Sequence, residues 1–367
     1  MRTSRRDFLA RSAFIALGAS IGTRSSDVQF TQAPKPRDVP WLGEILTVPP
    51  ISPARSPTHP RLLIDVSTRT EWDRRRAELE QLWQEMLGSL EVSRTRPPAV
   101  RVLEEDRVDE VRRQLVRYES EPGVQTEAYV LSRHQSQGHR PGALVFHSTA
   151  PQSIRQPAGL ADLPEKHFGL ALARRGFVAF CPRNFLWPET TRMAADEETR
   201  RFRARHPHAR GMAKMLFDGQ VALDILAARP DVDPERLGCI GHSLGAKEAL
   251  YLAAFEPRVK ATVSSEGGVG ISMSNWDAEW YLGPAAKEPG FAREHHELLA
   301  LAAPRPFLLV GGDSADGAAS WPFIAAAQPV YRLYGEPPRL GLLNHGKGHT
   351  VPPEMQSRLL EWLDTYV

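Results

Sequence analysis

From residue 143 onward, hydrophobic residues alternate between short continuous runs and longer stretches with the helical spacing of three and four. The runs are typical of strands buried on both faces, and the stretches between them of amphipathic helices. The pattern predicts strands at 143–146, 177–180, 237–240, 259–264, 307–310 and 340–343, and helices at 165–175, 210–228, 244–255, 321–334 and 353–366. This alternation predicts an α/β fold with a mostly parallel central sheet and helices on both faces.

The residues before and within this region add three further features. Alternating segments at 114–119 and 127–131 predict an antiparallel strand pair at the sheet edge, with a turn at Glu121-Pro122-Gly123 between them. Apolar spacing predicts a helix over 68–92, with Thr70 as its N-cap. After the predicted strand at 259–264, the sixth when the edge pair is included, an irregular insertion from 267 to 291 is expected to form a cap over the sheet edge.

The N-terminus has the layout of an export signal, because the basic segment 4–9 precedes a short apolar run at 13–22. Its paired Arg5 and Arg6, followed by Asp-Phe-Leu, resemble the twin-arginine signal. The export machinery is therefore an expected partner, and the periplasm or the extracellular space the expected location. The apolar run is too short for stable membrane insertion.

We expect four parts along the chain: a signal and leader at 1–33, a Pro-rich linker at 34–65, a helical extension at 66–109 and the α/β catalytic domain at 110–367. The 46 basic and 44 acidic residues nearly cancel, so the chain has no strong field toward nucleic acid, and no nucleic-acid partner is expected. The two cysteines are too few for a disulfide framework or a thiolate zinc site.

The most informative segment is the G-x-S-x-G motif at 241–245, which follows an apolar strand pattern and precedes a helix pattern. A sharp strand-to-helix turn strains the backbone of Ser243, so the residues two before and two after must be small, as Gly241 and Gly245 are. The turn aims the helix N-terminus at the serine oxygen, where the helix dipole and the Leu244 N–H can stabilise an oxyanion. The motif predicts Ser243 as a nucleophile.

A serine nucleophile needs a base, and in this architecture the histidine follows the acid along the chain. His349 is preferred, because it lies on a loop between a glycine and the last helix. His345 comes directly off the last strand and is expected to be buried. His295 and His296 are interpreted as surface residues.

Three carboxylates compete for the third position. Asp313 and Asp316 follow the strand at 307–310, where the carboxyl edge of the sheet gathers catalytic groups. Asp316 is preferred, because Asp313 can organise the turn through backbone amides. Glu266, after the preceding strand, is a third candidate or a substrate contact. The loop after strand 143–146 should supply a second oxyanion donor from the amide of Thr149 or Ser148.

From 110 to 367 the chain resembles the α/β-hydrolase superfamily, and within it the dienelactone hydrolase and acetyl xylan esterase group of exported bacterial hydrolases. The matching segments are 241–245, Ala303-Pro304-Arg305-Pro306-Phe307-Leu308-Leu309, the Asp313/Asp316 loop and Gly348-His349. The resemblance implies a Ser-His-Asp carboxylic ester hydrolase that forms an acyl-enzyme and needs no metal or organic cofactor. Dienelactone hydrolases proper use a cysteine, whereas the serine here favours ordinary carbohydrate or small acyl esters.

The chain also resembles glucuronoyl esterases. They carry a lysine four residues after the serine, like Lys247, and a Glu-containing Gly-rich segment after the next strand, like Glu266. They usually have arginine at the position of Leu244. In the cap, Trp276 and Trp280 are expected to form apolar walls against a sugar or acyl group.

The same residues bear on four alternative functions. A glucuronoyl methylesterase-like activity follows from the second resemblance. A prolyl-oligopeptidase-like peptidase would share the triad, but the chain lacks room for the large extra domain of those enzymes. A non-catalytic binding protein would not need an intact Ser/Asp/His set. A metal-dependent hydrolase would have to use His345 and His349, between which glycines interrupt any helix.

Overall fold

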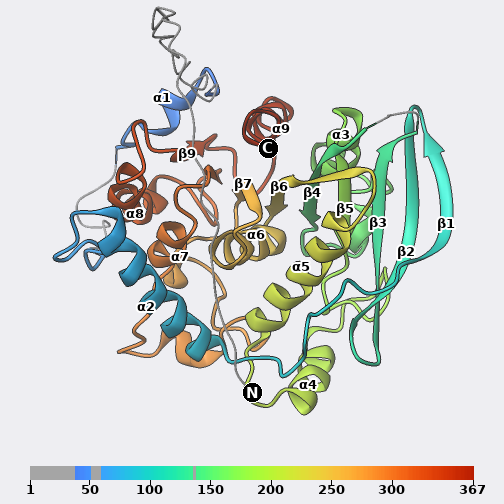
Figure 1. Ribbon diagram of the computed structural model, residues 1–367, viewed down its shortest axis with the longest axis horizontal. Helices are drawn as coiled ribbons and strands as arrows, with labels where there is room; N and C mark the ends of the chain where they lie inside the picture. The colour runs from blue at the N-terminus through green and yellow to red at the C-terminus, as the bar shows by residue number, and fades with distance from the viewer. Residues whose placement is uncertain (1–37, 51–58, 135–137) are drawn as a thin grey trace, which may run out of the picture. The chain divides into compact units, whose positions relative to one another are not determined.

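The computed structural model describes residues 38–50, 59–134 and 138–367. The predicted export signal lies outside the described residues. The described residues contain a nine-stranded sheet in the order β1-β2-β3-β5-β4-β6-β7-β8-β9, which runs from right to left in Figure 1. The strands are β1 (Arg101–Val108), β2 (Val111–Glu121), β3 (Val124–Arg133), β4 (Arg140–Phe146), β5 (Val178–Pro182), β6 (Val232–His242), β7 (Val259–Ser265), β8 (Phe307–Gly311) and β9 (Leu340–Asn344).

The sheet combines an antiparallel edge with a parallel centre. The pairs β1–β2, β2–β3 and β3–β5 are antiparallel, whereas β4, β5, β6, β7, β8 and β9 pair in parallel. The predictions of a mostly parallel sheet and of an antiparallel pair at its edge are confirmed. Parallel pairing brings the carboxyl ends of β4, β6, β7, β8 and β9 to one edge, where the predicted site residues lie.

Helices cover both faces of the sheet because neighbouring residues of each strand point to opposite sides. Val145 and Ile240 belong to one apolar cluster with α1, α3 and α9, whereas Leu144 and Cys239 belong to another with α5 and α6. The α-helices are α1 (Leu42–Ile45), α2 (Arg69–Leu87), α3 (Phe168–Arg174), α4 (Ala195–Arg205), α5 (Gly211–Ala227), α6 (Leu244–Phe255), α7 (His296–Leu301), α8 (Trp321–Arg332) and α9 (Pro353–Tyr366).

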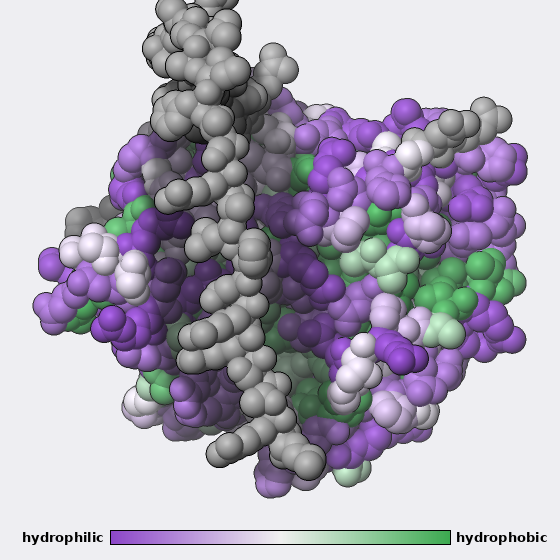
Figure 2. Space-filling view, in the orientation of Figure 1, coloured by the Kyte–Doolittle hydropathy of each residue, from purple (hydrophilic) through white to green (hydrophobic). Residues whose placement is uncertain are grey.

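The region before the predicted catalytic domain differs from expectation in detail. The N-cap of α2 is Thr68, in a capping box with Glu71, and not Thr70. The helix ends at Gly88 (φ +73°), where a Cβ would lie 2.0 Å from the His208 carbonyl oxygen. Residues 101–108, expected in a helical extension, form strand β1 instead. Charged side chains along this edge strand discourage pairing with another chain. The face seen in Figure 2 is mostly hydrophilic, with a hydrophobic area at its right-hand edge.

Part of the predicted linker packs on the body. Ile45 of α1 is fully buried, and a Cβ on Gly341 of β9 would lie 2.5 Å from the Ile45 carbonyl oxygen. Asp38 forms an ion pair with Arg339 at 2.6 Å. Residues 38–50 are therefore part of the folded body, and α4 and α7 are two further helices that the apolar spacing did not indicate.

Candidate active site

The nucleophile candidate lies on a strained turn between β6 and α6. Ser243 has φ 59° and ψ −115°, which a non-glycine residue adopts only when its surroundings hold it there. A Cβ on Gly241 would lie 2.1 Å from the Gly245 carbonyl, and a Cβ on Gly245 would lie 2.5 Å from the Phe146 carbonyl oxygen. Both glycines are therefore required, as the motif predicts. The Ser243 N–H donates to the Ser265 carbonyl at 2.8 Å, which fastens this turn to the end of β7.

Glu266, the residue directly after β7, contacts the candidate base. His349 Nδ1 lies 3.2 Å from Glu266 Oε2. The Glu266 side chain is fully buried, whereas the His349 side chain is 42% exposed. Within the part of the chain that the structure describes, the Ser243 hydroxyl has no hydrogen-bond partner, a common condition of a catalytic serine without substrate.

The structure corrects the preferred position of the acid. The Asp316 carboxylate accepts hydrogen bonds from the N–H groups of Gly268 (2.7 Å) and Val269 (2.8 Å) and from the Ser320 hydroxyl (2.8 Å). The carboxylate beside His349 is Glu266, the third candidate from the sequence. Burial raises the pKa of Asp316, and these three donors oppose the rise. Asp316 thus anchors the loop that follows Glu266.

The two rival residues have structural contacts of their own. Asp313 is exposed and accepts from Asn344 Nδ2 at 2.8 Å and from the Ala318 N–H at 3.3 Å, so it organises the turn as the alternative interpretation expected. His345 is half-buried, and its Nδ1 accepts from the Lys347 N–H at 3.1 Å. Burial lowers the pKa of His345.

His242, next to the nucleophile, packs against the base. Its ring centroid lies 4.8 Å from that of His349, and its Nδ1 lies 3.1 Å from Ser265 Oγ. Burial lowers the pKa of His242 well below its usual value, and the nearby Lys166 ammonium adds to this shift. A neutral imidazole therefore lies beneath His349.

The backbone N–H groups predicted as oxyanion donors differ in whether they already donate to a protein acceptor. The Ser148 N–H donates to Gln156 Oε1 at 3.1 Å and is therefore occupied. Among the described residues, the N–H groups of Leu244 and Thr149 donate to no protein acceptor. The close approach of Gly245 to the Phe146 carbonyl brings the start of α6 against the end of β4. The loop that carries Thr149 begins there.

Lys247 and Trp276, two of the predicted substrate contacts, form one buried cluster. Lys247 Nζ donates to Ser274 Oγ at 2.8 Å and lies 3.8 Å from the centre of the Trp276 ring. Burial lowers the pKa of Lys247 to about 7, although Asp316 opposes this shift. Trp276 is fully buried, and its Nε1 donates to the Gly268 carbonyl at 2.7 Å, so it belongs to the core beneath the cap. Trp280 is half-buried.

The interpretation of two other histidines as surface residues is wrong. His295 is fully buried, with Nδ1 against the Val269 carbonyl at 2.7 Å and Nε2 against the Tyr251 hydroxyl at 2.9 Å. His296 is 1% exposed and stacks on His59. The tertiary fold covers both residues because the cap and α2 close over α7.

Cys181 and Cys239 are free, buried thiols on β5 and β6, which β4 separates. Burial raises the pKa of Cys239 to about 12. Over residues 38–50, 59–134 and 138–367, no cluster of three or more potential metal ligands was found, and no helix is long and apolar enough to cross a membrane.

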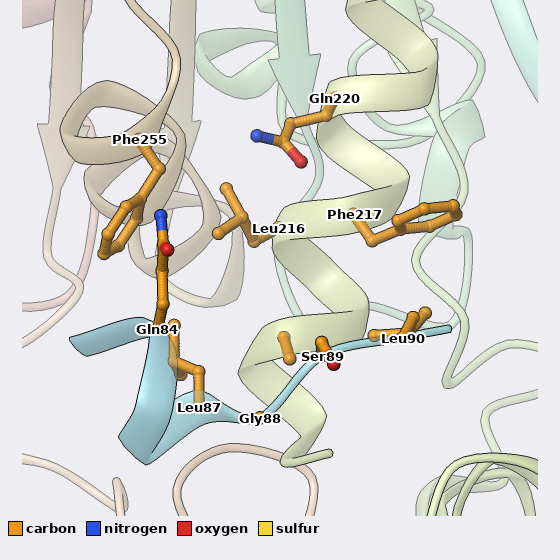
Figure 3. A pocket seen from close by; sticks show the side chains of 10 residues that line it. Gln84, Leu87, Gly88, Ser89, Leu90, Leu216, Phe217, Gln220 and Phe255 are labelled. Carbon is orange, nitrogen blue, oxygen red and sulfur yellow. The ribbon is translucent and has the colours of Figure 1, made fainter. Parts of the chain in front are cut away.

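A separate cavity of about 240 Å³ lies between α2, α5 and the end of α6. Gln84 and Leu87 of α2 face Leu216 of α5 and Phe255 of α6 across it (Figure 3). Phe255 ends the 12-residue helix that begins next to Ser243, so this cavity lies about 18 Å from the nucleophile along the helix. It is not part of the candidate active site.

Comparison with known proteins agrees with this geometry. Residues 129–281, which include the Ser243 turn and Glu266, match the model of the dienelactone hydrolase family. This segment is similar to a dienelactone hydrolase family domain. The chain is 28% identical over 195 residues to YtaP of Bacillus subtilis (strain 168), which carries the name of a hydrolase, and the match covers 50% of this chain and 64% of that protein.

A second relative carries a more specific name. The chain is 28% identical over 142 residues to 4-O-methyl-glucuronoyl methylesterase 1 of Sodiomyces alcalophilus, a match that covers 31% of this chain and 29% of that protein. The chain thus spans less than two thirds of either curated relative.

Solved structures show the α/β-hydrolase fold of the whole body. A glucuronoyl esterase from Solibacter usitatus superposes with a TM-score of 0.65 at 15% identity, covering 86% of this chain and 99% of that one. A structure from Bacteroides fragilis NCTC 9343, whose name suggests an acetyl xylan esterase, superposes with a TM-score of 0.62 at 14% identity, covering 81% of each chain. The predicted fold and the resemblance to these groups are confirmed.

Proposed function

We propose that this protein is a serine esterase that cleaves carboxylic esters through an acyl-enzyme. The observation that carries the proposal is the contact of His349 Nδ1 with the buried Glu266, next to the strained Ser243 turn. We assign Ser243 as the nucleophile, His349 as the base and Glu266 as the acid that orients it. The N–H groups of Leu244 and Thr149 form the oxyanion hole.

The mechanism follows from these placements. The Glu266 carboxylate accepts a hydrogen bond from the Nδ1–H group of His349, which leaves Nε2 as the unprotonated base. Ser243 Oγ attacks the ester carbonyl while its proton moves to Nε2, and the carbonyl oxygen becomes an oxyanion bound by the two N–H groups. Collapse breaks the bond to the alkoxy oxygen, which takes the proton from Nε2 and leaves as the alcohol. Water then attacks the acyl-enzyme by the same steps and releases the acid and Ser243.

A carbohydrate ester is the substrate class that we propose, with acetyl esters on a sugar as the first choice. This choice is supported by two similar structures, one named a glucuronoyl esterase and the other given the name of an acetyl xylan esterase. A methyl ester of a glucuronic acid is the second candidate, supported by the curated relative of that name and by the positions of Lys247 and Glu266. Leu244 departs from the arginine usual in that group.

The test is hydrolysis of acetylated xylan, a methyl glucuronate ester and p-nitrophenyl acetate by the wild-type chain and by Ser243→Ala. We expect hydrolysis by the wild type and a loss of about 10⁶-fold in kcat for the variant, as in other serine hydrolases. A variant that retains wild-type activity would contradict the proposal. Failure of a fluorophosphonate to label Ser243 would instead favour a non-catalytic binding protein.

Export by the twin-arginine route is the second part of the proposal, and it is supported by the sequence at Arg5 and Arg6 alone. Replacing both by lysine should retain the full-length protein in the cytoplasm of a bacterium with this pathway, whereas the unaltered chain should be recovered outside it. Equal distribution of the two forms would contradict export by this route.

A further inference from the structure

The two oxyanion donors of the proposed esterase lie on different elements, so their relative position depends on contacts between those elements. Leu244 begins α6, and Thr149 lies on the loop after β4. Three buried polar side chains that take no part in the proposed chemistry lie between them: His147 (2% exposed), Asn184 (5%) and Glu248 (7%).

These side chains form a continuous hydrogen-bonded chain. Asn184 Nδ2 donates to Glu248 Oε1, and the Asn184 N–H donates to His147 Nε2 at 3.1 Å. His147 Nδ1 lies 2.8 Å from the Ser148 carbonyl oxygen. Asn184 is itself oriented, because its Oδ1 accepts from the Leu186 N–H at 3.0 Å.

These hydrogen bonds determine the tautomer of His147. A backbone N–H can only donate, so Nε2 must be the acceptor and Nδ1 must carry the proton that it donates to the Ser148 carbonyl. Burial lowers the pKa of His147 to about 4, which keeps the ring neutral at physiological pH. The edge of Trp187 packs against the imidazole, with ring centroids 4.8 Å apart.

The hydrogen bond to Ser148 acts on the next residue through peptide planarity. The Ser148 carbonyl and the Thr149 N–H belong to one planar trans peptide unit, in which they point in opposite directions. Fixing the carbonyl with His147 therefore fixes the direction of the Thr149 N–H. The other side of Ser148 is held by its N–H bond to Gln156, so neither end of this residue is free to rotate.

Glu248, at the far end of this hydrogen-bonded series, connects it to the helix that carries the Leu244 N–H. Glu248 lies four residues after Leu244, one turn further along α6 and on the same face. Burial raises the pKa of Glu248 to about 8, so its carboxyl group is mostly protonated at neutral pH and is buried without a full charge.

We propose that His147, Asn184 and Glu248 are positioning residues that hold the Thr149 N–H at a constant distance and direction from the Leu244 N–H. The proposal rests on the proposed esterase function. It identifies a connection between the two halves of the oxyanion hole that runs through side chains outside the catalytic triad.

The experiment compares the wild type with His147→Leu on p-nitrophenyl acetate, and measures inhibition by an aryl trifluoromethyl ketone, whose ionised adduct with Ser243 mimics the oxyanion. We expect kcat to fall about 10²-fold, within the range for loss of one oxyanion donor. KM should change less than about threefold, and inhibitor affinity should fall by a factor similar to that of kcat. His296→Leu is the matched control, because His296 is equally buried and burial lowers its pKa to about 4 as well. This control should leave both quantities unchanged.

Two pairs of variants, one at His147 and one at Glu248, keep the test decisive if His147→Leu does not fold. Asparagine can place a donor near the Nδ1 position, whereas glutamine extends toward the Nε2 position. His147→Asn should therefore retain about tenfold more kcat than His147→Gln. In the same way, Glu248→Gln, which keeps an acceptor for Asn184, should retain about tenfold more kcat than Glu248→Leu.

The possible failures are distinguishable. If the wild type and Ser243→Ala are equally inactive on every ester, the esterase function fails. If the wild type is active and folded His147→Leu has the same kcat and inhibitor affinity as the wild type, the positioning role is overturned and the esterase function stands. The same conclusion follows if His147→Asn and His147→Gln have equal kcat and inhibitor affinity and Glu248→Gln and Glu248→Leu do too.

Discussion

The loops after β7 and β8 are built alike, yet they have different relations to the site. Glu266, directly after β7, accepts from the N–H groups of Ala315 (2.7 Å) and Asp316 (3.4 Å) in the loop after β8. Asp316 in turn accepts from the N–H groups of Gly268 and Val269 in the loop after β7. Each carboxylate therefore stabilises the backbone of the other loop.

The contact that sets Glu266 apart is the one with the candidate base. Glu266 also reaches His349, because it follows the strand without an intervening residue and adopts a positive φ of 57°. Asp316 lies five residues past β8, folded back beneath its own loop, and acts on Lys247 electrostatically. Both buried carboxylates thus stabilise loop structure, and Glu266 is the one that also contacts the candidate base.

The largest expected effect separates the two acids by activity. Glu266→Gln should lower kcat on p-nitrophenyl acetate by about 10⁴-fold, because an amide beside Nδ1 favours the wrong tautomer of His349. Asp316→Asn is the matched isosteric control and should lower kcat less than about tenfold. A larger loss in Asp316→Asn would return the role of triad acid to Asp316.

The second prediction concerns how much the buried Asp316 carboxylate contributes to the free energy of unfolding. Asp316→Ala leaves two backbone N–H groups and the Ser320 hydroxyl without their acceptor in a buried site, so the free energy of unfolding should fall by about 3 kcal/mol or more. Urea denaturation measures this fall. Asp313→Ala, at an exposed position in the same loop, should lower it by about 1 kcal/mol. Equal losses would show that burial of the Asp316 carboxylate has little energetic effect.

A pH series tests the electrostatic role of Asp316. The pKa of Lys247 is lowered from 10.5 to about 7 by burial. Between these values the unfolded chain binds a proton that the folded chain lacks, so stability rises with pH across this window. Relative to Lys247→Met, the wild type should therefore lose stability as the pH falls from 10.5 toward 7, with no further loss below about 7.

Combining this series with the carboxylate variants sharpens the comparison. Because Asp316 raises the pKa of Lys247, Asp316→Asn should extend the window to lower pH, whereas Glu266→Gln should leave it in place. Urea unfolding of Asp316→Asn and Glu266→Gln at several pH values across the window measures both effects. Parallel stability curves for the wild type and Lys247→Met would contradict the lowered pKa.

The smallest expected effect concerns one donor to Asp316. Ser320→Ala removes the hydroxyl that donates to Asp316 Oδ1 and leaves both backbone donors in place. The free energy of unfolding should fall by about 1–2 kcal/mol, and kcat should not change. A fall in kcat comparable with that of Glu266→Gln would instead link the loop after β8 directly to catalysis.

The sequence predicted those parts of the site that depend on local chain geometry. The Ser243 turn requires small residues at 241 and 245, and the structure shows backbone atoms within 2.5 Å of the positions that their Cβ atoms would take. His349 was predicted because a short loop connects the last strand with the last helix. The buried positions of His295 and His296 were missed, because a polar stretch gives no sign that the cap and α2 will cover it.

By itself, the sequence determined the alternation of strands and helices in the parallel part of the sheet and the strained turn at Ser243, and it predicted His349 as the base, because hydrophobic spacing and steric limits act over a few residues. Only the tertiary structure decided which carboxylate meets that histidine and which amide remains free for an oxyanion. Glu266 and His349 are 83 residues apart, and Gly268 and Asp316 are 48 apart. Such contacts depend on how parallel strands align their carboxyl ends, which no local pattern specifies.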